Sequence, residues 1–242
     1  MGGLGARRVG RPQAGARPPD RVQGRAGGEV KTAVRVPPLA ALAAGVALWH
    51  LPTVVDRLLG GLDFGVILAL RWLAAALLLG FVLAVERRPP SSVGLRAPRG
   101  RDVLITVGLS VLTLVIAYSL YGLLAGAGPD QQTQSGQIIT SLSVVGSVHL
   151  ILNAAVVEEL FYRGFLMERV IDLTGRPWLA ALVSYALFVG GHLPGSGGIT
   201  TLTVVAVGSL LFVGLYWARR NLLLCVGAHA VLDLPILAVA LT

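Results

Sequence analysis

Two adjacent carboxylates and a nearby arginine form the first group able to do chemistry, in Glu158-Glu159-Leu160-Phe161-Tyr162-Arg163. Residues four apart share one face of an α-helix, so Glu159 and Arg163 can form an ion pair. Glu158 points about 100° further around the helix and is left free to face a bundle interior. One carboxylate held and its neighbour available suits a general base. The alternative is a charge cluster at a helix end.

Two further motifs place histidines at the same four-residue spacing. Phe188 and His192 share a helix face, with two glycines between them that permit close approach of another backbone and Pro194 ending the helix. His229 and Asp233 also share a face. The alternatives are a buried packing histidine for the first motif and a hydrogen-bonded pair that ties two helices together for the second.

The spacing of these motifs predicts that they meet at one depth. Glu158 and His192 lie 16 and 15 residues from the turn at 174–177, or about 23 Å along two antiparallel helices. His229 lies eight residues after Asn221, about 12 Å into its own helix. We therefore expect the three motifs to converge on one layer.

The elements that must position these residues are membrane helices. Of the 242 residues, 55% are hydrophobic and 13% are charged, and the mean hydropathy is +0.76. A soluble domain carries about 25% charged residues, and a disordered chain has low hydrophobicity, so both classes are excluded. The single cysteine, Cys225, excludes an intrachain disulfide and a cysteine-based metal site. The fold class predicted is an all-α, polytopic transmembrane helix bundle.

Apolar runs indicate about seven spans. They cover approximately residues 38–55, 64–85, 103–125, 137–160, 177–193, 199–217 and 221–241. Basic residues gather in alternate connections, with eighteen on one side, Arg57 on the other and Arg71 within a span. By the positive-inside rule, the N-terminus is cytoplasmic. The segment from Arg163 to Pro177 is expected to be one of these connections, with its charged part projecting from the membrane.

Three parts are expected along the chain. Residues 1–36, with a net charge of +6, form a disordered basic N-terminal arm; residues 37–128 form accessory transmembrane helices; residues 129–242 form the catalytic helix bundle. The arm is either an orientation signal, an over-extended start or a segment that binds anionic lipid, whereas nucleic acid binding is not expected. Nineteen of the twenty basic residues are arginine, which is typical of a GC-rich genome and suggests a bacterial cell membrane.

Ionisable and polar groups inside apolar runs are functional candidates by default, because burying them in a bilayer is costly. These are His50, Arg71, His149, Asn153, Glu158, Glu159, Arg163, His192, His229 and Asp233. Nine of the twelve acids are expected to face water: Asp20, Glu29, Asp56, Asp63, Glu86, Asp102, Asp130, Glu168 and Asp172. The other three are Glu158, Glu159 and Asp233.

The three motifs resemble the pattern of the CPBP family of intramembrane proteases, which comprises CaaX proteases and bacteriocin-processing enzymes and is also called Abi. That pattern is EExxxR, then FxxxH, then HxxxN or HxxxD, and the chain carries all three in order over its last hundred residues. The segment Ser92–Arg96 weakly resembles a Gly-Leu segment found upstream in the family. The N-terminal half otherwise adds nothing specific.

The resemblance implies an intramembrane endopeptidase. Glu158 and His192 would activate a water, and His229 and Asp233 would stabilise the oxyanion. An anion beside an oxyanion is repulsive, so Asp233 is either protonated or orients His229. Glu159 belongs to the same catalytic set.

Structural support is expected around this set. Arg163 would fix the helix together with Glu159, and Phe188 and Phe161 would serve as packing.

No cofactor is expected, although a divalent metal is the alternative. If zinc is bound, Glu158, His192 and His229 would be its ligands with one position open. The chain has no HExxH motif, and the residues also suffice for a metal-free glutamate mechanism. The partners expected are membrane lipid and a protein or peptide substrate, possibly lipidated. A prenylated CaaX tail and a small bacteriocin-type peptide are both open.

Two other functions remain as alternatives. A catalytically silent membrane scaffold or immunity protein would keep the same fold. A proton-coupled transporter would use Glu158 and His192 as a relay, but the internal repeat expected of transporters is not found.

Overall fold

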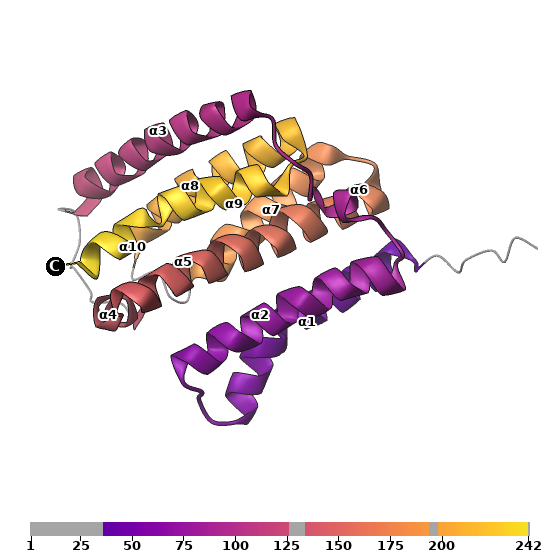
Figure 1. Cartoon of the computed structure of the whole chain (residues 1–242), viewed down its shortest axis with the longest axis horizontal. Helices are drawn as coiled ribbons and strands as arrows, with labels where there is room; N and C mark the ends of the chain where they lie inside the picture. The colour runs from indigo at the N-terminus through magenta and orange to yellow at the C-terminus, as the bar shows by residue number, and fades with distance from the viewer. Residues whose placement is uncertain (1–35, 126–133, 194–197, 242) are drawn as a thin grey trace, which may run out of the picture. The chain divides into compact units, whose positions relative to one another are not determined.

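The computed structural model describes residues 36–125, 134–193 and 198–241, and every regular element within these ranges is a helix (Figure 1). The all-α class is therefore confirmed. The predicted basic arm falls, apart from Val36, outside the described residues. So does the central part of the connection predicted at 126–137.

Six of the described helical segments are long and apolar enough to cross a membrane. They are Pro38–Leu58, Phe64–Val85, Gly100–Leu124, Val144–Thr174, Leu202–Arg219 and Leu222–Val239. In the numbering of Figure 1, they correspond to α1 (Pro38–Leu58), α2 (Phe64–Gly80) with η1 (Phe81–Val85), α3 (Gly100–Ala125), α5 (Val144–Glu159) with its continuation, α8 (Ile199–Arg219), and α9 (Leu222–Leu232) with α10 (Leu234–Val239).

The remaining predicted span is the shorter apolar helix α7 (Pro177–His192). Its 16 residues extend about 24 Å, less than the roughly 30 Å of a hydrocarbon core. The bundle of about seven helices is thus present, with one helix too short to cross a full-thickness bilayer without adjustment.

One continuous helix runs through the centre of the motif region. After α5 it continues as a π-helical segment, η3 (Leu160–Met167), and then as α6 (Glu168–Thr174). Its 31 residues extend about 46 Å. Gly175, in a left-handed conformation at φ 65°, ends it. The predicted span at 137–160 is therefore wrong at both ends.

The start of that helix is set by a cap. The short helix α4 (Gln134–Ser141) is separate from it, and Ser143 then caps α5, with its hydroxyl accepting a hydrogen bond from the amide of Gly146 at 3.2 Å. Hydropathy alone does not detect a serine cap inside an otherwise apolar run. The span consequently begins several residues later than predicted.

The π-helical turn carries part of the motif Glu158–Arg163, and all eight of its residues are buried. A π-helical turn disturbs the regular i to i−4 hydrogen bonding and leaves carbonyls to be satisfied by other groups. Here the Ser184 hydroxyl on α7 donates to the Tyr162 carbonyl at 3.0 Å. This contact ties α7, which carries His192, to the helix that carries Glu158.

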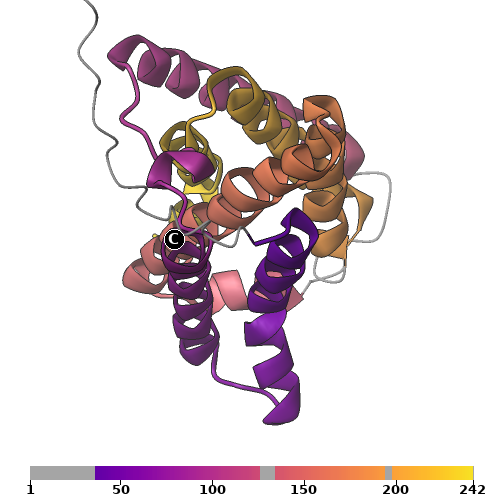
Figure 2. The same ribbon diagram turned by 90° about the vertical axis from the view of Figure 1, so that its right-hand side faces the viewer.

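The helices pack around this central element. The α5–η3 region contacts α2, α7 and α9, whereas α3 packs against α8 and α9 on the other side (Figures 1 and 2). In Figure 1, α1 and α2 lie below the motif-bearing helices and α3 lies above them. The central helix is therefore enclosed by helices from both halves of the chain.

The segment Ser92–Arg96 joins this core. It lies partly in the short 3₁₀ turn η2 (Pro90–Val93), which packs against η3. The Gly94 carbonyl accepts from the amide of Leu222 at 2.8 Å, and the Arg96 carbonyl accepts from the side-chain amide of Asn221 at 3.0 Å. Gly94 adopts φ 76°, and an added Cβ there would lie 2.8 Å from the ring of Tyr216. A glycine is therefore required at this docking point.

Candidate active site

Glu158 is held by a residue from the N-terminal half of the chain. Its Oε1 accepts a hydrogen bond from Nη2 of Arg71, on α2, at 2.6 Å. The expectation that Glu158 stays unpaired is therefore wrong. Helical spacing reports partners within one helix, and this partner comes from another helix 87 residues earlier.

The other oxygen of Glu158 faces a histidine. Oε2 lies 4.0 Å from Nε2 of His192. Nδ1 of His192 lies 2.8 Å from the carbonyl of Phe188, which can only accept, so Nδ1 carries the proton. In the neutral ring, Nε2 is then the basic nitrogen, and it faces the carboxylate.

Glu159 connects two of the motifs. Its Oε1 accepts from Nη1 of Arg163 at 2.9 Å, which confirms the predicted i,i+4 ion pair, and also lies 2.8 Å from Nδ1 of His229. Glu159 and Arg163 are fully buried, and His229 is nearly so. This carboxylate therefore fixes the height of α9 against α5.

Arg163 is enclosed by aromatic rings. Its guanidinium carbon lies 4.3 Å from the centre of the Phe188 ring and 5.1 Å from that of Phe212, and its Nη2 donates to the Ser209 hydroxyl at 2.9 Å. A desolvated guanidinium over an aromatic face is stabilised by the quadrupole of the ring. The proposed supporting residues Arg163 and Phe188 thus contact each other directly.

Phe188 also brings the two histidines together. Its ring centre lies 4.7 Å from that of His192 and 6.1 Å from that of His229. His229 in turn stacks on Phe212, with ring centres 4.7 Å apart and planes 14° apart. The predicted convergence of the three motifs on one layer is therefore confirmed.

Asp233 completes the constellation less tightly. It caps α9, and its Oδ2 lies 3.5 Å from Nε2 of His229. Since Nδ1 of His229 donates to Glu159, Nε2 carries a proton only when the ring is an imidazolium. In that state His229 lies between two carboxylates and presents a charged donor.

The charged stretch after Arg163 is packed against other helices of the bundle. Arg169 is fully buried, and its Nε donates to Oε1 of Glu86 at 2.9 Å while its Nη2 contacts Oε2 of Glu86. Glu86 was expected to face water, but 2% of its side chain is exposed. Glu168 is likewise paired, with Tyr216 at 2.8 Å and Arg220 at 2.6 Å. Partners on other helices, which sequence spacing does not report, account for this difference.

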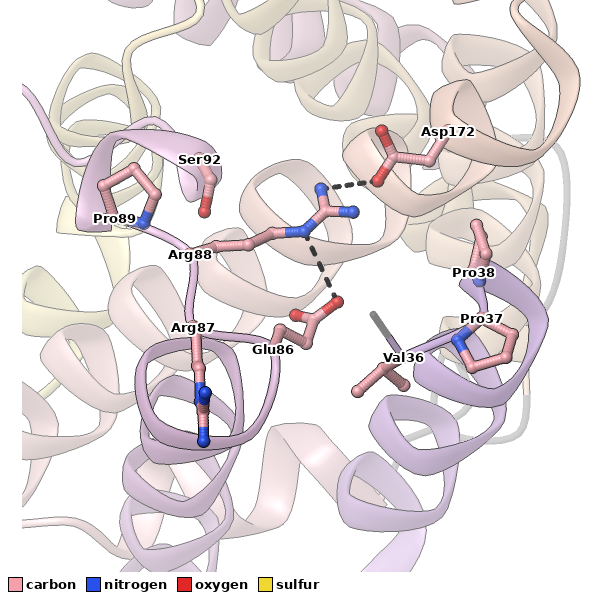
Figure 3. Close-up of a pocket in the computed structure, with 9 residues that line it drawn as sticks. All are labelled: Val36, Pro37, Pro38, Glu86, Arg87, Arg88, Pro89, Ser92 and Asp172. Atoms are coloured by element: carbon pink, nitrogen blue, oxygen red, sulfur yellow. Dashed lines mark hydrogen bonds and ion pairs between the residues drawn. The ribbon is translucent and has the colours of Figure 1, made fainter. Parts of the chain in front are cut away.

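Arg88 extends this second group. It lies between Glu86, 3.7 Å from its Nε, and Asp172, which accepts from its Nη1 at 2.6 Å (Figure 3). We call Glu86, Arg88, Arg169 and Asp172 the Glu86 cluster. A cavity of about 760 Å³ beside it is lined partly by Pro37 and Pro38, and none of the predicted site residues borders it.

We call Arg71, Glu158, Glu159, Arg163, His192, His229 and Asp233 the Glu158 cluster. Two residues that contact the motif side chains, Arg71 and Ser209, do not belong to any of the three motifs. Arg71 stands out in the sequence as a lone cation inside an apolar run, but the sequence does not indicate which residue it pairs with. Ser209 has no signal, since a serine in an apolar helix is common.

The three residues suggested as zinc ligands are not arranged as a ligand set. Within the described parts of the chain, no three His, Cys, Asp or Glu side chains form a group that could hold a metal ion. His229 turns one nitrogen to Glu159 and the other to Asp233, rather than to the Glu158–His192 pair. In this geometry they do not fit a three-ligand site, and the metal-free mechanism stays a prediction.

Comparison with known proteins bears on residues 140–235, which match the type II CAAX prenyl endopeptidase Rce1-like family. This region is therefore similar to CaaX proteases, in agreement with the resemblance that the three motifs carry. The match contains six of the seven residues of the Glu158 cluster and leaves out Arg71. No curated protein and no solved structure matches the chain.

This match supports a coarse assignment. The family is one of membrane proteases, and the chain has six described helices able to span a membrane. The protein is therefore an integral, multi-pass membrane protein, and its residues 140–235 match a family of hydrolases.

Proposed function

We propose that this protein is an intramembrane endopeptidase of the CaaX type that hydrolyses a peptide bond with a water activated by Glu158 and His192. The observation that carries the proposal is the 4.0 Å separation of Glu158 Oε2 and His192 Nε2. A water about 2.8 Å from both atoms would make an angle of about 91° between them, which suits its two hydrogen-bonding directions. Both groups come from helices within the family match.

One side of the proposed site is exposed and the other is buried. The side chain of His192 is 36% exposed, whereas that of Glu158 is 11% exposed. A peptide approaching at His192 can therefore meet a water that the buried carboxylate holds on the other side. Low solvent access strengthens the electrostatic interactions at such a site.

In the proposed reaction, the oxygen of this water attacks the peptide carbonyl carbon while Glu158 takes its proton. The carbonyl oxygen becomes an oxyanion, which the imidazolium form of His229 stabilises through its Nε2–H, shared with Asp233 Oδ2 3.5 Å away, while Nδ1 stays bonded to Glu159. The carbon–nitrogen bond then breaks, and Glu158 returns the proton to the leaving amine. The residues supply a base, an acid and an oxyanion donor.

The substrate that the family favours is a protein or peptide with a prenylated cysteine near its C-terminus. The test is Glu158→Gln in the full-length protein in membranes, assayed with a fluorogenic prenylated CaaX peptide. A parallel comparison of protein termini covers other substrates. We expect cleavage to fall about 10²- to 10⁴-fold, with the protein still inserted and folded.

The matched control is Asp102→Asn, which removes a carboxylate paired with Arg219 at 3.0 Å, outside the Glu158 cluster. It should keep wild-type cleavage. Full activity of Glu158→Gln would contradict the proposal, and rescue of a cellular phenotype by that variant would favour the catalytically silent scaffold.

Metal dependence has its own test. Thoroughly chelated protein should cleave the peptide at the rate of untreated protein, because the proposed groups supply the base and the oxyanion donor. Loss of cleavage that stoichiometric zinc restores would overturn the metal-free mechanism.

A further inference from the structure

The pair between Arg71 and Glu158 is not explained by the family motifs. Arg71 lies outside the matched region, 69 residues before its first residue at 140. Its Nη2 nevertheless lies 2.6 Å from the carboxylate assigned as the base. An arginine within a span is costly unless it is paired, so its place there requires a reason.

The contact with Arg71 gives the two oxygens of Glu158 different surroundings. Oε1 accepts from Arg71, and Oε2 lies towards His192. A carboxylate attached to its chain by rotatable bonds needs a fixed partner to keep one oxygen in position. The guanidinium supplies that partner and also the opposite charge that a largely buried carboxylate requires.

The height of Arg71 is itself fixed. One turn earlier on α2, the Leu68 carbonyl accepts from the side-chain amide of Asn153 on α5 at 3.1 Å. Asn153 is fully buried, and Leu68 is 3% exposed. This bond sets the register of α2 against α5 within one helical turn of the Arg71–Glu158 pair.

We propose that Arg71 is a positioning residue for the reaction. It holds Glu158 as an oriented carboxylate with Oε2 facing His192, and does not itself touch the substrate. The inference rests on the proposed function. It gives the accessory helix α2, which the motifs leave without a role, a direct part in assembling the active site.

The test compares three variants of the full-length protein in the fluorogenic peptide assay. Arg71→Met keeps most of the apolar stem and removes the charge. Arg71→Lys keeps the charge and one donor, which suffices because the contact is through one nitrogen. Arg57→Gln, at the exposed end of α1, is the control for loss of an arginine from the same half of the chain.

We expect Arg71→Met to lower kcat about 100-fold with KM within about twofold, because a misplaced base affects the chemical step. Arg71→Lys should recover most of that loss, and Arg57→Gln should match the wild type. Wild-type activity in Arg71→Met would overturn the inference. So would higher activity, since the pair would then be an inhibitory latch.

A purely structural role gives a different pattern. In that case Arg71→Met and Arg71→Lys would lose activity only in proportion to their loss of folded protein, which also overturns the inference. Failure of the proposed function is distinguished by Glu158→Gln, measured alongside. If that variant keeps full activity, the base itself is wrongly assigned, and the role of Arg71 falls with it.

Discussion

The Glu158 cluster and the Glu86 cluster are both groups of largely buried charges that join the α2–η1 helix to the central helix. In the Glu86 cluster, every carboxylate has an arginine within ion-pair distance, and both oxygens of Glu86 are engaged by Arg169. In the Glu158 cluster, one oxygen of Glu158 is engaged by arginine and the other faces a histidine nitrogen at 4.0 Å. Buried charge is therefore common to both clusters, and the second differs in that a largely buried carboxylate oxygen faces an imidazole.

The difference indicates what each group can do. Paired carboxylates and guanidiniums hold helices together, and their net contribution to stability is set by the balance of attraction and desolvation. A carboxylate that shares its site with imidazoles can accept and return protons. We therefore assign structural work to the Glu86 cluster and chemistry to the Glu158 cluster.

If this distinction holds, the largest loss of cleavage among the following variants is expected at His192. His192→Ala should lower cleavage about 10²- to 10⁴-fold with little change in melting temperature, because more than a third of the side chain is exposed. Kinetics with the prenylated peptide, together with a thermal melt, check both parts.

His149→Ala is the matched control for that variant. His149 lies on α5 and accepts from the indole of Trp72 at 3.1 Å, outside the Glu158 cluster. It should retain wild-type activity. Equal loss in both variants would show that neither histidine is specific to the chemistry.

Glu86→Gln should act in the opposite way. It removes the nearer charge partner of the buried Arg169 and leaves Asp172, 3.8 Å away, and breaking a buried pair costs up to about 3–5 kcal/mol of unfolding free energy. Chemical unfolding in detergent measures this loss, and cleavage per folded molecule should stay unchanged.

The more exposed partner in that cluster provides the comparison. Asp172, with 30% of its side chain exposed, contacts Arg88 and lies 3.8 Å from Arg169. Asp172→Asn should therefore be less destabilising than Glu86→Gln. The reverse order would contradict the role given to burial.

The smallest effect expected is at Ser184, which satisfies the carbonyl of Tyr162 in the π-helical turn. Ser184→Ala should lower the unfolding free energy by about 1 kcal/mol and cleavage by a few-fold, because the turn carries residues next to Glu158. Melting and initial rates on the same sample measure the two effects.

Ser110→Ala is its control, since that buried hydroxyl donates to the Thr106 carbonyl at 2.8 Å within α3. It should cost similar stability and leave cleavage unchanged. If both variants lost activity, the loss in Ser184→Ala could not be assigned to the π-helical turn.

Much of the fold follows from the sequence because hydropathy and helical spacing are local properties. They indicate an all-helical membrane bundle, the Glu159–Arg163 pair and the meeting of Glu158 with His192, and the structure confirms each. The cap at Ser143 and the π-helical turn at 160–167 depend on local hydrogen bonding that hydropathy does not report.

The contacts made by the N-terminal half could not be predicted from the sequence for a different reason. Arg71 and Glu86 reach Glu158 and Arg169 across more than 80 residues, and a single sequence does not state which buried cation meets which buried anion. This half therefore lies outside the family match, as expected, and still contributes a partner to each cluster. The basic arm, the three-part division of the chain, the cytoplasmic N-terminus and the bacterial source stay predictions.

The most direct test compares Glu158→Gln with Glu86→Gln in one experiment that records peptide cleavage per folded molecule and unfolding free energy. Both substitutions replace an arginine-paired carboxylate with an amide, but Arg71, the partner of Glu158, is 24% exposed, whereas Arg169, the partner of Glu86, is fully buried. We expect Glu158→Gln to lose cleavage while remaining folded, and Glu86→Gln to lose stability while its folded fraction cleaves at the wild-type rate. Retained cleavage in Glu158→Gln, or equal loss per folded molecule in both, would contradict the assignment of the chemistry to Glu158.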